Sequence, residues 1–471
     1  MVETSLEKIF LHQKAASLRL RKQDISVRLE FLSHLEKAIQ NNLEDISAAL
    51  VSDFSKPKAE TLLTEIFPVM HEIRLAKRNL KSWTKPKKVK APITMLGTQN
   101  FVISEPRGVC LIVGPWNYPF QLCISPLICA VAAGNTAFIK PSEFTPATNK
   151  ILIKIIKEAF PEEIVAIVEG GPETTQELLE LPFDHIFFTG STRVGKIIME
   201  AASKHLSSIT LELGGKSPTI IDSSANLKIA CEKLVWSKFI NAGQTCVAPD
   251  YILVQKNIIN DFKSIFIATL NQFYGSSDLE KKNSPDFARI ITQKHTERLQ
   301  ELIQNALSLN AEIITGGEVD LQNRYVAPTV LHKVDPHATV MQDEIFGPIL
   351  PLIEFKDIHE AIHFVNERPK PLALYIYSQS ESNISAILKE TSSGGVCVND
   401  SIIHLANPHL PFGGVGPSGI GSYHGVHGFR AFSHEKAVLR QSWLGILLRV
   451  TYPPYTGLKM KILNKLIQWK L

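Results

Sequence analysis

The sequence is poor in the features that mark small secreted, metal-binding or membrane-spanning proteins. Its 471 residues include six cysteines, but these form no CxxC pair and no cysteine–histidine cluster with zinc-finger spacing. The start, MVETSLEKIF, lacks the basic and apolar segments of a secretory signal. The longest apolar run, from Leu122, is shorter than the ~18 residues of a spanning helix and contains a proline. We therefore expect a cytoplasmic protein with free thiols and no metal site.

An excess of charge of one sign is missing as well. The chain has 50 basic and 46 acidic residues, a formal net charge of +4, so its charge does not indicate a nucleic-acid-binding surface. A hydrophobic fraction of 44% is typical of an ordinary globular protein. A chain of this length can bury a large core without disulfides or metals, and it allows about three domains.

The pattern of apolar residues changes along the chain. The first ~80 residues place them at three- and four-residue intervals, which predicts helices. From Cys110 to Gly214, short apolar runs alternate with helix-like segments, which predicts βαβ units around a parallel sheet. A second mixed region follows Gly214. Ligands in such α/β sheets bind beyond the carboxyl ends of the strands.

Three loops lie at the predicted carboxyl ends of strands. In GPWNYP (114–119), the amide of Asn117 could donate to a developing oxyanion, although a turn residue is the simpler interpretation. In FTGSTRVG (188–195), the glycines bracket a helix start that favours phosphate, but glycine there also serves backbone geometry alone. In LELGGKSP (211–218), Glu212 is either a salt-bridged glutamate or a general base with a raised pKa.

Cys246 stands apart from the other cysteines because its neighbours are small and polar. It lies in NAGQTCVAPDY (241–251), which resembles a loop and not an apolar run. A cysteine nucleophile needs a partner that handles protons, and no histidine is near it in the sequence. The residues alone leave its role open.

Seven motifs together resemble the NAD(P)-dependent aldehyde dehydrogenase superfamily. They occur in its order and spacing: GPWNYP, IKPSE, FTGSTRVG, LELGGKSP, GQTCVAP, EIFGP and PFGGVGPSG. YHGVHGF, FSHEKAV and YPPY are similar to the class 3 branch, the fatty and aromatic aldehyde dehydrogenases. Other branches often have a lysine in the helix after GPWNYP, where this chain has SPLIC, as class 3 does. The resemblance covers nearly the whole chain.

The resemblance implies a catalytic mechanism. Cys246 would attack the aldehyde carbon as a thiolate, while Asn117 and the backbone N–H of residue 246 hold the oxyanion. Hydride transfer to the nicotinamide would leave a thioester, and Glu212 would activate the water that hydrolyses it. The proton partner of the cysteine is then a glutamate from a distant loop.

The resemblance also implies a cofactor site and an aldehyde tunnel. The residues that match cofactor contacts are Trp116, Lys140, Glu143, Gly190, Ser191, Gly195, Glu344 and Phe346. A carboxylate at position 143 near the ribose hydroxyls favours NAD, with NADP possible as in other class 3 enzymes. Tyr118 and Phe412 match residues that line the tunnel for an apolar aldehyde, and core packing is the equally weighted alternative.

The fold that the resemblance implies has a doubly wound, parallel-sheet cofactor domain, an α/β catalytic domain and a small β bridging element. We expect strand exchange through the bridge to make a homodimer. The expected ranges are 1–84 with 105–211 for the cofactor domain, 212–428 for the catalytic domain, 85–104 with 429–445 for the bridge, and 446–471 for a C-terminal tail. The tail alternates apolar residues with lysines at helical spacing, which fits either a helix lying on anionic lipid or packing against the partner subunit.

Three rival functions differ in chemistry. An acylating dehydrogenase would pass the acyl group to coenzyme A, but a hydrolytic base at Glu212 would waste the thioester. A non-enzymatic member such as a crystallin loses catalytic residues, whereas Cys246, Glu212 and Asn117 are all present. A cofactor-free thiol esterase leaves the cofactor motifs without a purpose.

Overall fold

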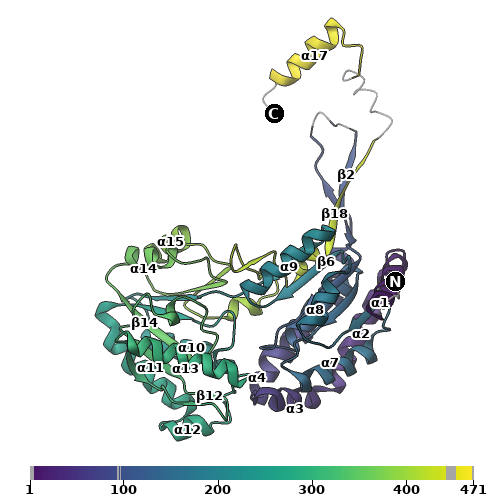
Figure 1. Cartoon of the computed structure of the whole chain (residues 1–471). Coiled ribbons are helices and arrows are strands. Elements are labelled where there is room, and N and C mark those ends of the chain that lie inside the picture. Colours follow the sequence, from purple (N-terminus) through teal and green to yellow (C-terminus); the bar gives the residue numbers. More distant parts are fainter. Residues whose placement is uncertain (1–4, 93–94, 96, 442–451, 469–471) are drawn as a thin grey trace.

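The computed structural model describes residues 5–92, 95, 97–441 and 452–468. Two α/β bodies lie side by side, and a narrow β arm projects from one of them (Figure 1). The predicted fold class, with parallel sheets covered by helices, is confirmed.

The first body is built on a six-stranded sheet in the order β17-β7-β6-β3-β4-β5. Neighbouring strands are parallel, except that β17 joins β7 antiparallel. The strands are β3 (Val109–Val113), β4 (Thr136–Lys140), β5 (Val165–Ile167), β6 (His185–Thr189), β7 (Ser208–Glu212) and β17 (Gly419–Ile420). The helices between them are α6 (Gln121–Ala133), α7 (Pro146–Ala159), α8 (Pro172–Leu179) and α9 (Thr192–His205). The residues of α6 from Leu122 onward are all buried, as expected for a helix that is apolar all round.

The second body contains a seven-stranded sheet in the order β10-β13-β14-β9-β8-β15-β16, parallel except for the β10–β13 pair. Its strands are β8 (Pro218–Ile221), β9 (Tyr251–Gln255), β10 (Glu312–Thr315), β13 (Thr329–His332), β14 (Ile349–Phe355), β15 (Ala373–Tyr377) and β16 (Gly395–Val398). Its helices are α10 (Leu227–Phe239), α11 (Ile259–Tyr274), α12 (Asp278–Asn283), α13 (Gln293–Ser308), α14 (Ile358–Asn366) and α15 (Glu381–Glu390). A two-stranded ribbon of β11 (Val319–Asp320) and β12 (Tyr325–Val326) lies beside them.

The N-terminal helices pack on the first body. They are α1 (Ser5–Leu20), α2 (Ile25–Asn41), α3 (Leu43–Phe54), α4 (Lys58–Thr61) and α5 (Phe67–Trp83). A π-helical turn, η1 (Leu62–Ile66), joins α4 to α5. Single π turns inside helices occur frequently at functional sites. Near the end of the chain, α16 (Gly425–Ala431) returns to pack on α5 and α6.

The arm is a three-stranded antiparallel sheet of β1 (Lys87–Val89), β2 (Gln99–Pro106) and β18 (Ser433–Arg440), with β2 in the middle. Beyond it lies α17 (Gly457–Gln468), where Leu458 and Ile467 are 71% and 81% exposed (Figure 1). Residues 442–451 and 469–471, which belong to the predicted bridge and tail, lie outside the described residues. None of the described helices is long and apolar enough to cross a bilayer.

The predicted domain boundaries stay a prediction. One strand lies apart from the body to which its sequence range assigns it: β17 falls within 212–428, yet it extends the sheet of the first body beside β7.

Candidate active site

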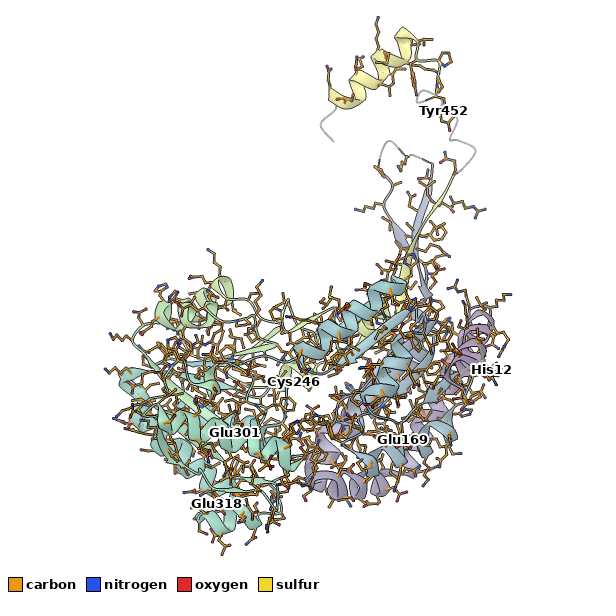
Figure 2. The ribbon with its side chains drawn as sticks, in the orientation of Figure 1. His12, Glu169, Cys246, Glu301, Glu318 and Tyr452 are labelled. Carbon is orange, nitrogen blue, oxygen red and sulfur yellow. The ribbon has the colours of Figure 1, made fainter. Side chains whose placement is uncertain are left out.

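A large cavity lies between the two bodies, at the carboxyl ends of the strands of the first sheet. Its volume is about 1040 Å³, and Cys246, Glu212 and Asn117 all line it. Figure 2 shows Cys246 at the junction of the two bodies. Three residues from separate segments therefore meet in one place, as the resemblance predicted.

Cys246 lies in a turn that follows α10 and the 3-10 segment Ile240–Gly243. It is the only one of the six cysteines that is not fully buried. The segment leading to it is conformationally unusual, because Asn241 and Ala242 both have positive φ, at 55° and 52°. Burial raises the pKa of the Cys246 thiol, and the nearby Glu344 and Glu212 raise it further. The resting side chain is therefore a neutral thiol.

Glu212 ends β7 and is 3% exposed. Neither of its carboxylate oxygens has a hydrogen-bond partner. Burial alone raises the pKa of this carboxyl well above its ordinary value. An unpartnered buried carboxyl is unfavourable for the fold, so it indicates a chemical use and not a structural one. The surface or salt-bridged interpretation of Glu212 does not fit these contacts.

Asn117 is held against the segment that leads to Cys246. Its Nδ2 donates to the carbonyl oxygen of Gln244 at 3.0 Å, and the Nδ2 of Asn241 donates to the Asn117 carbonyl at 3.0 Å. One of the two amide hydrogens of Asn117 is thus used in orienting the side chain. The other hydrogen remains for a ligand in the cavity.

Five residues predicted to contact the cofactor line the first-body wall of the cavity: Trp116, Lys140, Glu143, Gly190 and Ser191. Ser191 caps the start of α9, and its hydroxyl accepts from the N–H of Val194 at 3.4 Å. Lys140 Nζ donates to Glu143 Oε2 at 3.3 Å. The N-terminus of a helix that opens onto a cavity is a site for phosphate.

Gly195 does not line the cavity. It lies in the first turn of α9 and is buried against the sheet. A Cβ at this position would come 2.7 Å from Leu213 Cδ2, so glycine lets α9 lie close to the chain after β7. A role in direct cofactor contact stays a prediction.

Glu344 and Phe346 line the opposite wall. The Glu344 carboxylate lies against Gly214, where a Cβ would overlap it, and it accepts from the N–H of Gly215. Burial and Asp250 raise the pKa of Glu344 to about 8. Phe346 has a positive φ of 49° and packs edge-on against Trp116, with ring centroids 5.2 Å apart.

Tyr118 and Phe412, the predicted tunnel residues, are outside the lining of this cavity, and each is 9% exposed. The Tyr118 hydroxyl is 2.6 Å from Thr245 Oγ1, next to Cys246. Phe412 packs against Tyr423 and His424. Their role toward substrate stays a prediction.

Several neighbours of the site were missed by sequence reasoning. His295 and Arg298 line the cavity from α13, and the His295 ring packs edge-on against Trp116. Arg298 donates to the carbonyl oxygens of Glu344 and Ile345, which fixes the segment carrying Glu344. Both residues lie on an amphipathic helix that belongs to none of the quoted motifs. The only signal in the sequence is their three-residue separation, which places them on the same face of α13.

The cavity fits a dinucleotide cofactor. A helix N-terminus, two aromatic rings and a lysine–glutamate pair surround a space at the upper end of the range for small-molecule sites. The unpartnered oxygens of Glu212 leave room and hydrogen-bonding capacity at the inner end, beside Cys246.

Comparison with known proteins agrees with this geometry. Residues 3–438 match the model of the aldehyde dehydrogenase family. A 4,4'-diaponeurosporen-aldehyde dehydrogenase from Staphylococcus aureus is 46% identical, covering 96% of this chain and 97% of its own. Aldehyde dehydrogenase family 3 member A2 of Pongo abelii is 45% identical, over 91% and 87%. A rat aldehyde dehydrogenase described as dimeric and NADP-preferring is 43% identical, over 92% and 94%.

A solved structure shares the whole architecture. The substrate-bound state of Staphylococcus aureus AldH superimposes with a TM-score of 0.93 at 45% identity, covering 98% of this chain and 100% of that one. Relatives in family 3 confirm the predicted class 3 branch. Together with a cavity lined by Cys246, Glu212 and Asn117, these matches show that this chain belongs to the aldehyde dehydrogenase family, as an NAD(P)-dependent oxidoreductase that acts on aldehydes.

Proposed function

We propose that this enzyme oxidises apolar aldehydes, aliphatic with medium or long chains or aromatic, to carboxylic acids through a covalent intermediate on Cys246. The thiol of Cys246 passes its proton to the Glu212 carboxylate, which releases it to solvent. The sulfur bonds to the aldehyde carbon, and the amide of Asn117 with the backbone N–H of residue 246 stabilises the oxyanion. Bound NAD(P)⁺ supplies the oxidant by accepting hydride. The residues that would hold this cofactor line the cavity: Trp116, Lys140, Glu143, Gly190, Ser191, Glu344 and Phe346.

The observation that carries this proposal is the unpartnered carboxyl of Glu212 in the same cavity as Cys246. A base with a raised pKa can take a proton from water and release it again as the acid product leaves. Water attacks the thioester carbon, the carbon–sulfur bond breaks, and the thiol of Cys246 is restored. A hydrolytic base also favours the acid over a coenzyme A ester as the product.

Trapping the intermediate tests the proposal. Glu212→Gln should form the acyl enzyme and stall, giving one equivalent of NADH per site and a mass increase on Cys246 after denaturation. Cys246→Ser should give neither. Steady turnover by Cys246→Ser, or by Glu212→Gln at the wild-type rate, would contradict the mechanism. Acid production that requires coenzyme A would favour the acylating rival.

The substrate class is proposed from the resemblance and from a relative's name. The Staphylococcus relative is named as a 4,4'-diaponeurosporen-aldehyde dehydrogenase. The buried ring of Tyr118 contacts Thr245 beside Cys246, and Phe412 is a second buried ring that the resemblance assigns to the tunnel for an apolar chain. A series of aldehydes of increasing chain length, assayed with NAD and with NADP, should show kcat/KM rising with length. A flat series would contradict it.

We also propose a homodimer that forms through the arm. β18 is an edge strand, and edge strands present unpaired backbone groups to another chain. The rat relative is described as dimeric. Light scattering of the full chain should give twice the monomer mass, and truncation after Phe432 should give a monomer. A monomeric full chain would contradict the dimer.

The tail is proposed to lie on anionic lipid. On α17, Leu458 and Ile462 are exposed together with lysines at positions 461 and 465. Such a helix can place its apolar side in the lipid interface while the lysines contact headgroups. Removing the residues after Tyr455 should abolish binding to anionic vesicles. Equal binding by the truncated chain would exclude the lipid role and leave packing against a partner subunit.

A further inference from the structure

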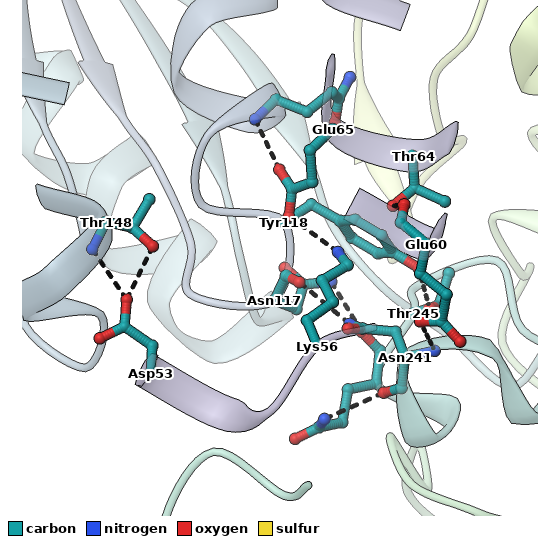
Figure 3. Close-up of polar contacts among 12 residues, drawn as sticks. Asp53, Lys56, Glu60, Thr64, Glu65, Asn117, Tyr118, Thr148, Asn241 and Thr245 are labelled. Carbon is teal, nitrogen blue, oxygen red and sulfur yellow. Dashed lines mark hydrogen bonds and ion pairs between the residues drawn. The ribbon is translucent and has the colours of Figure 1, made fainter. Parts of the chain in front are cut away.

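Three charged residues of the N-terminal helices lie next to the catalytic centre. Lys56 precedes α4, Glu60 lies in α4, and Glu65 lies in the π turn η1. We call Lys56, Glu60 and Glu65 the charged clamp. Because hydrogen bonds in a π turn join residues five apart, the turn brings Glu60 and Glu65 toward the same side of the chain. Figure 3 shows both carboxylates on the side of Asn117 and Tyr118.

The centre of the clamp is a fully buried ion pair under an aromatic ring. Lys56 Nζ is 2.8 Å from Glu65 Oε1, and both side chains are 0% exposed. The same Nζ lies 3.9 Å from the centroid of the Tyr118 ring, which is cation–π contact in a site without water access (Figure 3). Burial lowers the pKa of Lys56, and the charge of Glu65 opposes that effect.

The two carboxylates bind backbone N–H groups on both sides of the active site. The second oxygen of Glu65 accepts from the N–H of Gln121 at 2.8 Å, at the start of α6. Glu60 Oε2 accepts from the N–H of Asn241 at 2.9 Å, where the backbone has positive φ (Figure 3). The clamp therefore contacts the chain just after Asn117, at Tyr118 and Gln121, and the segment that leads to Cys246, at Asn241.

A hydrogen bond directly joins the segment that contains Asn117 and Tyr118 to the segment that leads to Cys246. The hydroxyl of Tyr118, beneath which Lys56 sits, is 2.6 Å from Thr245 Oγ1. Tyr118 follows the oxyanion donor Asn117, and Thr245 precedes the nucleophile Cys246. A shift of the Tyr118 ring would thus change the distance between donor and sulfur.

We infer that the charged clamp is a set of positioning residues, with Lys56 and Glu65 holding Tyr118 and Glu60 holding Asn241, so that the Asn117 amide is kept at the place where the oxyanion forms beside Cys246. The inference rests on the proposed catalytic roles of Cys246 and Asn117. A misplacement of about 1 Å in such a constellation costs on the order of 10²-fold in rate.

The test compares two reactions of the same sulfur. Alkylation of Cys246 by iodoacetamide needs an accessible thiol but no oxyanion donor, whereas aldehyde oxidation needs both. The main variant is Lys56→Met/Glu65→Gln, which removes both buried charges and keeps an acceptor for the N–H of Gln121. The matched control is Lys281→Met, which replaces a lysine that is 4% exposed on α12, away from the cavity.

The double variant should lose between about 10- and 100-fold in kcat for aldehyde, with iodoacetamide alkylation and NAD affinity within about twofold of the wild type. Lys281→Met should leave all three unchanged. Wild-type kcat in the double variant would overturn the inference. Parallel loss of turnover, alkylation and NAD affinity would also overturn it, because that pattern describes general destabilisation.

A second variant covers the case in which the double variant does not fold. Tyr118→Phe keeps every charge and the ring but removes the hydrogen bond to Thr245. It should show the same split between turnover and alkylation, with kcat about 3- to 10-fold lower, and an unchanged kcat would overturn the inference. Failure of the proposed function appears differently, as turnover by Cys246→Ser with the clamp intact.

Discussion

Glu212 and Glu65 are both buried glutamates, but they differ in their hydrogen-bond partners. This difference distinguishes a proposed catalytic carboxyl from a structural one. Glu212 is 3% exposed and neither of its oxygens has a partner. Glu65 is 0% exposed, yet one oxygen pairs with Lys56 and the other accepts from Gln121. The proposed reaction would use the carboxyl of Glu212, whereas the carboxylate of Glu65 is stabilised by complete pairing. Variants on each side can test this contrast.

The largest effect is expected from breaking the paired side. Lys56→Met leaves the Glu65 carboxylate buried without its cation, which should lower the free energy of unfolding by about 3–5 kcal/mol in urea denaturation. Lys58→Met is the matched control, because its pair with Glu44 is exposed, at 56% and 80%, and should change stability by less than about 1 kcal/mol. Equal losses in the two variants would remove the contrast between them.

On the reactive side, loss of the oxyanion donor should affect rate and not stability. Asn117→Ala should lower kcat by about 10²- to 10³-fold, because the amide that remains free for the oxyanion is removed. Steady-state NADH formation measures it, with the NAD Kd as the internal control. A similar fall in NAD affinity would show that Asn117 holds the cavity together and does not act on the oxyanion.

Replacing the ionisable carboxyl of Glu212 by an amide should make the protein more stable. With a folded pKa raised above the unfolded value, the native state retains a proton that the unfolded chain has lost, so wild-type stability falls as pH rises through this window. Glu212→Gln lacks this loss, so its free energy of unfolding should exceed that of the wild type by about 1 kcal/mol or more at pH 8. The difference should be smaller at pH 5. Thermal unfolding at both pH values measures it. Glu173→Gln, at an exposed site, should show no such gain.

The smallest effect is expected at the rim of the cavity. The Glu143 side chain is 37% exposed and pairs with Lys140, so its charge acts through partly solvated surroundings. Glu143→Gln should raise kcat/KM for NADP relative to NAD by about fivefold, since a 2′-phosphate no longer meets a carboxylate. The exposed Glu200→Gln on α9 serves as the control. An unchanged ratio would exclude Glu143 as the residue that sets cofactor preference.

The resemblance implied that Cys246, Glu212 and Asn117 meet, whereas the residues alone placed only the loops of Asn117 and Glu212 at strand ends. The alternation of short, mostly apolar runs with helices also predicted the parallel sheet of the first body. The role of Gly195 could not be judged from sequence. A glycine that allows α9 to approach Leu213 and a glycine that contacts phosphate are the same residue in a sequence.

The charged clamp could not be found from sequence. Lys56, Glu60 and Glu65 occur in SKPKAETLLTEIF, where a 3.6-residue period gives no reason to bury Lys56 and Glu65 and to half-bury Glu60. The π turn at Leu62–Ile66 changes the helical period locally, and its residues, LLTEI, are compatible with an ordinary α-helix. The partners of these residues are far along the chain: the ring of Tyr118 lies against Lys56, and the N–H of Asn241 donates to Glu60.

The pairing of β17 with β7 sets an order of assembly for the enzyme. Gly419 is the strand partner of Glu212, although about two hundred residues separate them in the chain. A ribosome must therefore release nearly all of the protein before the strand that presents this carboxyl acquires its neighbour. Copies that end before residue 419 lack that neighbour, so in them β7 would carry Glu212 on an unpaired edge of the sheet.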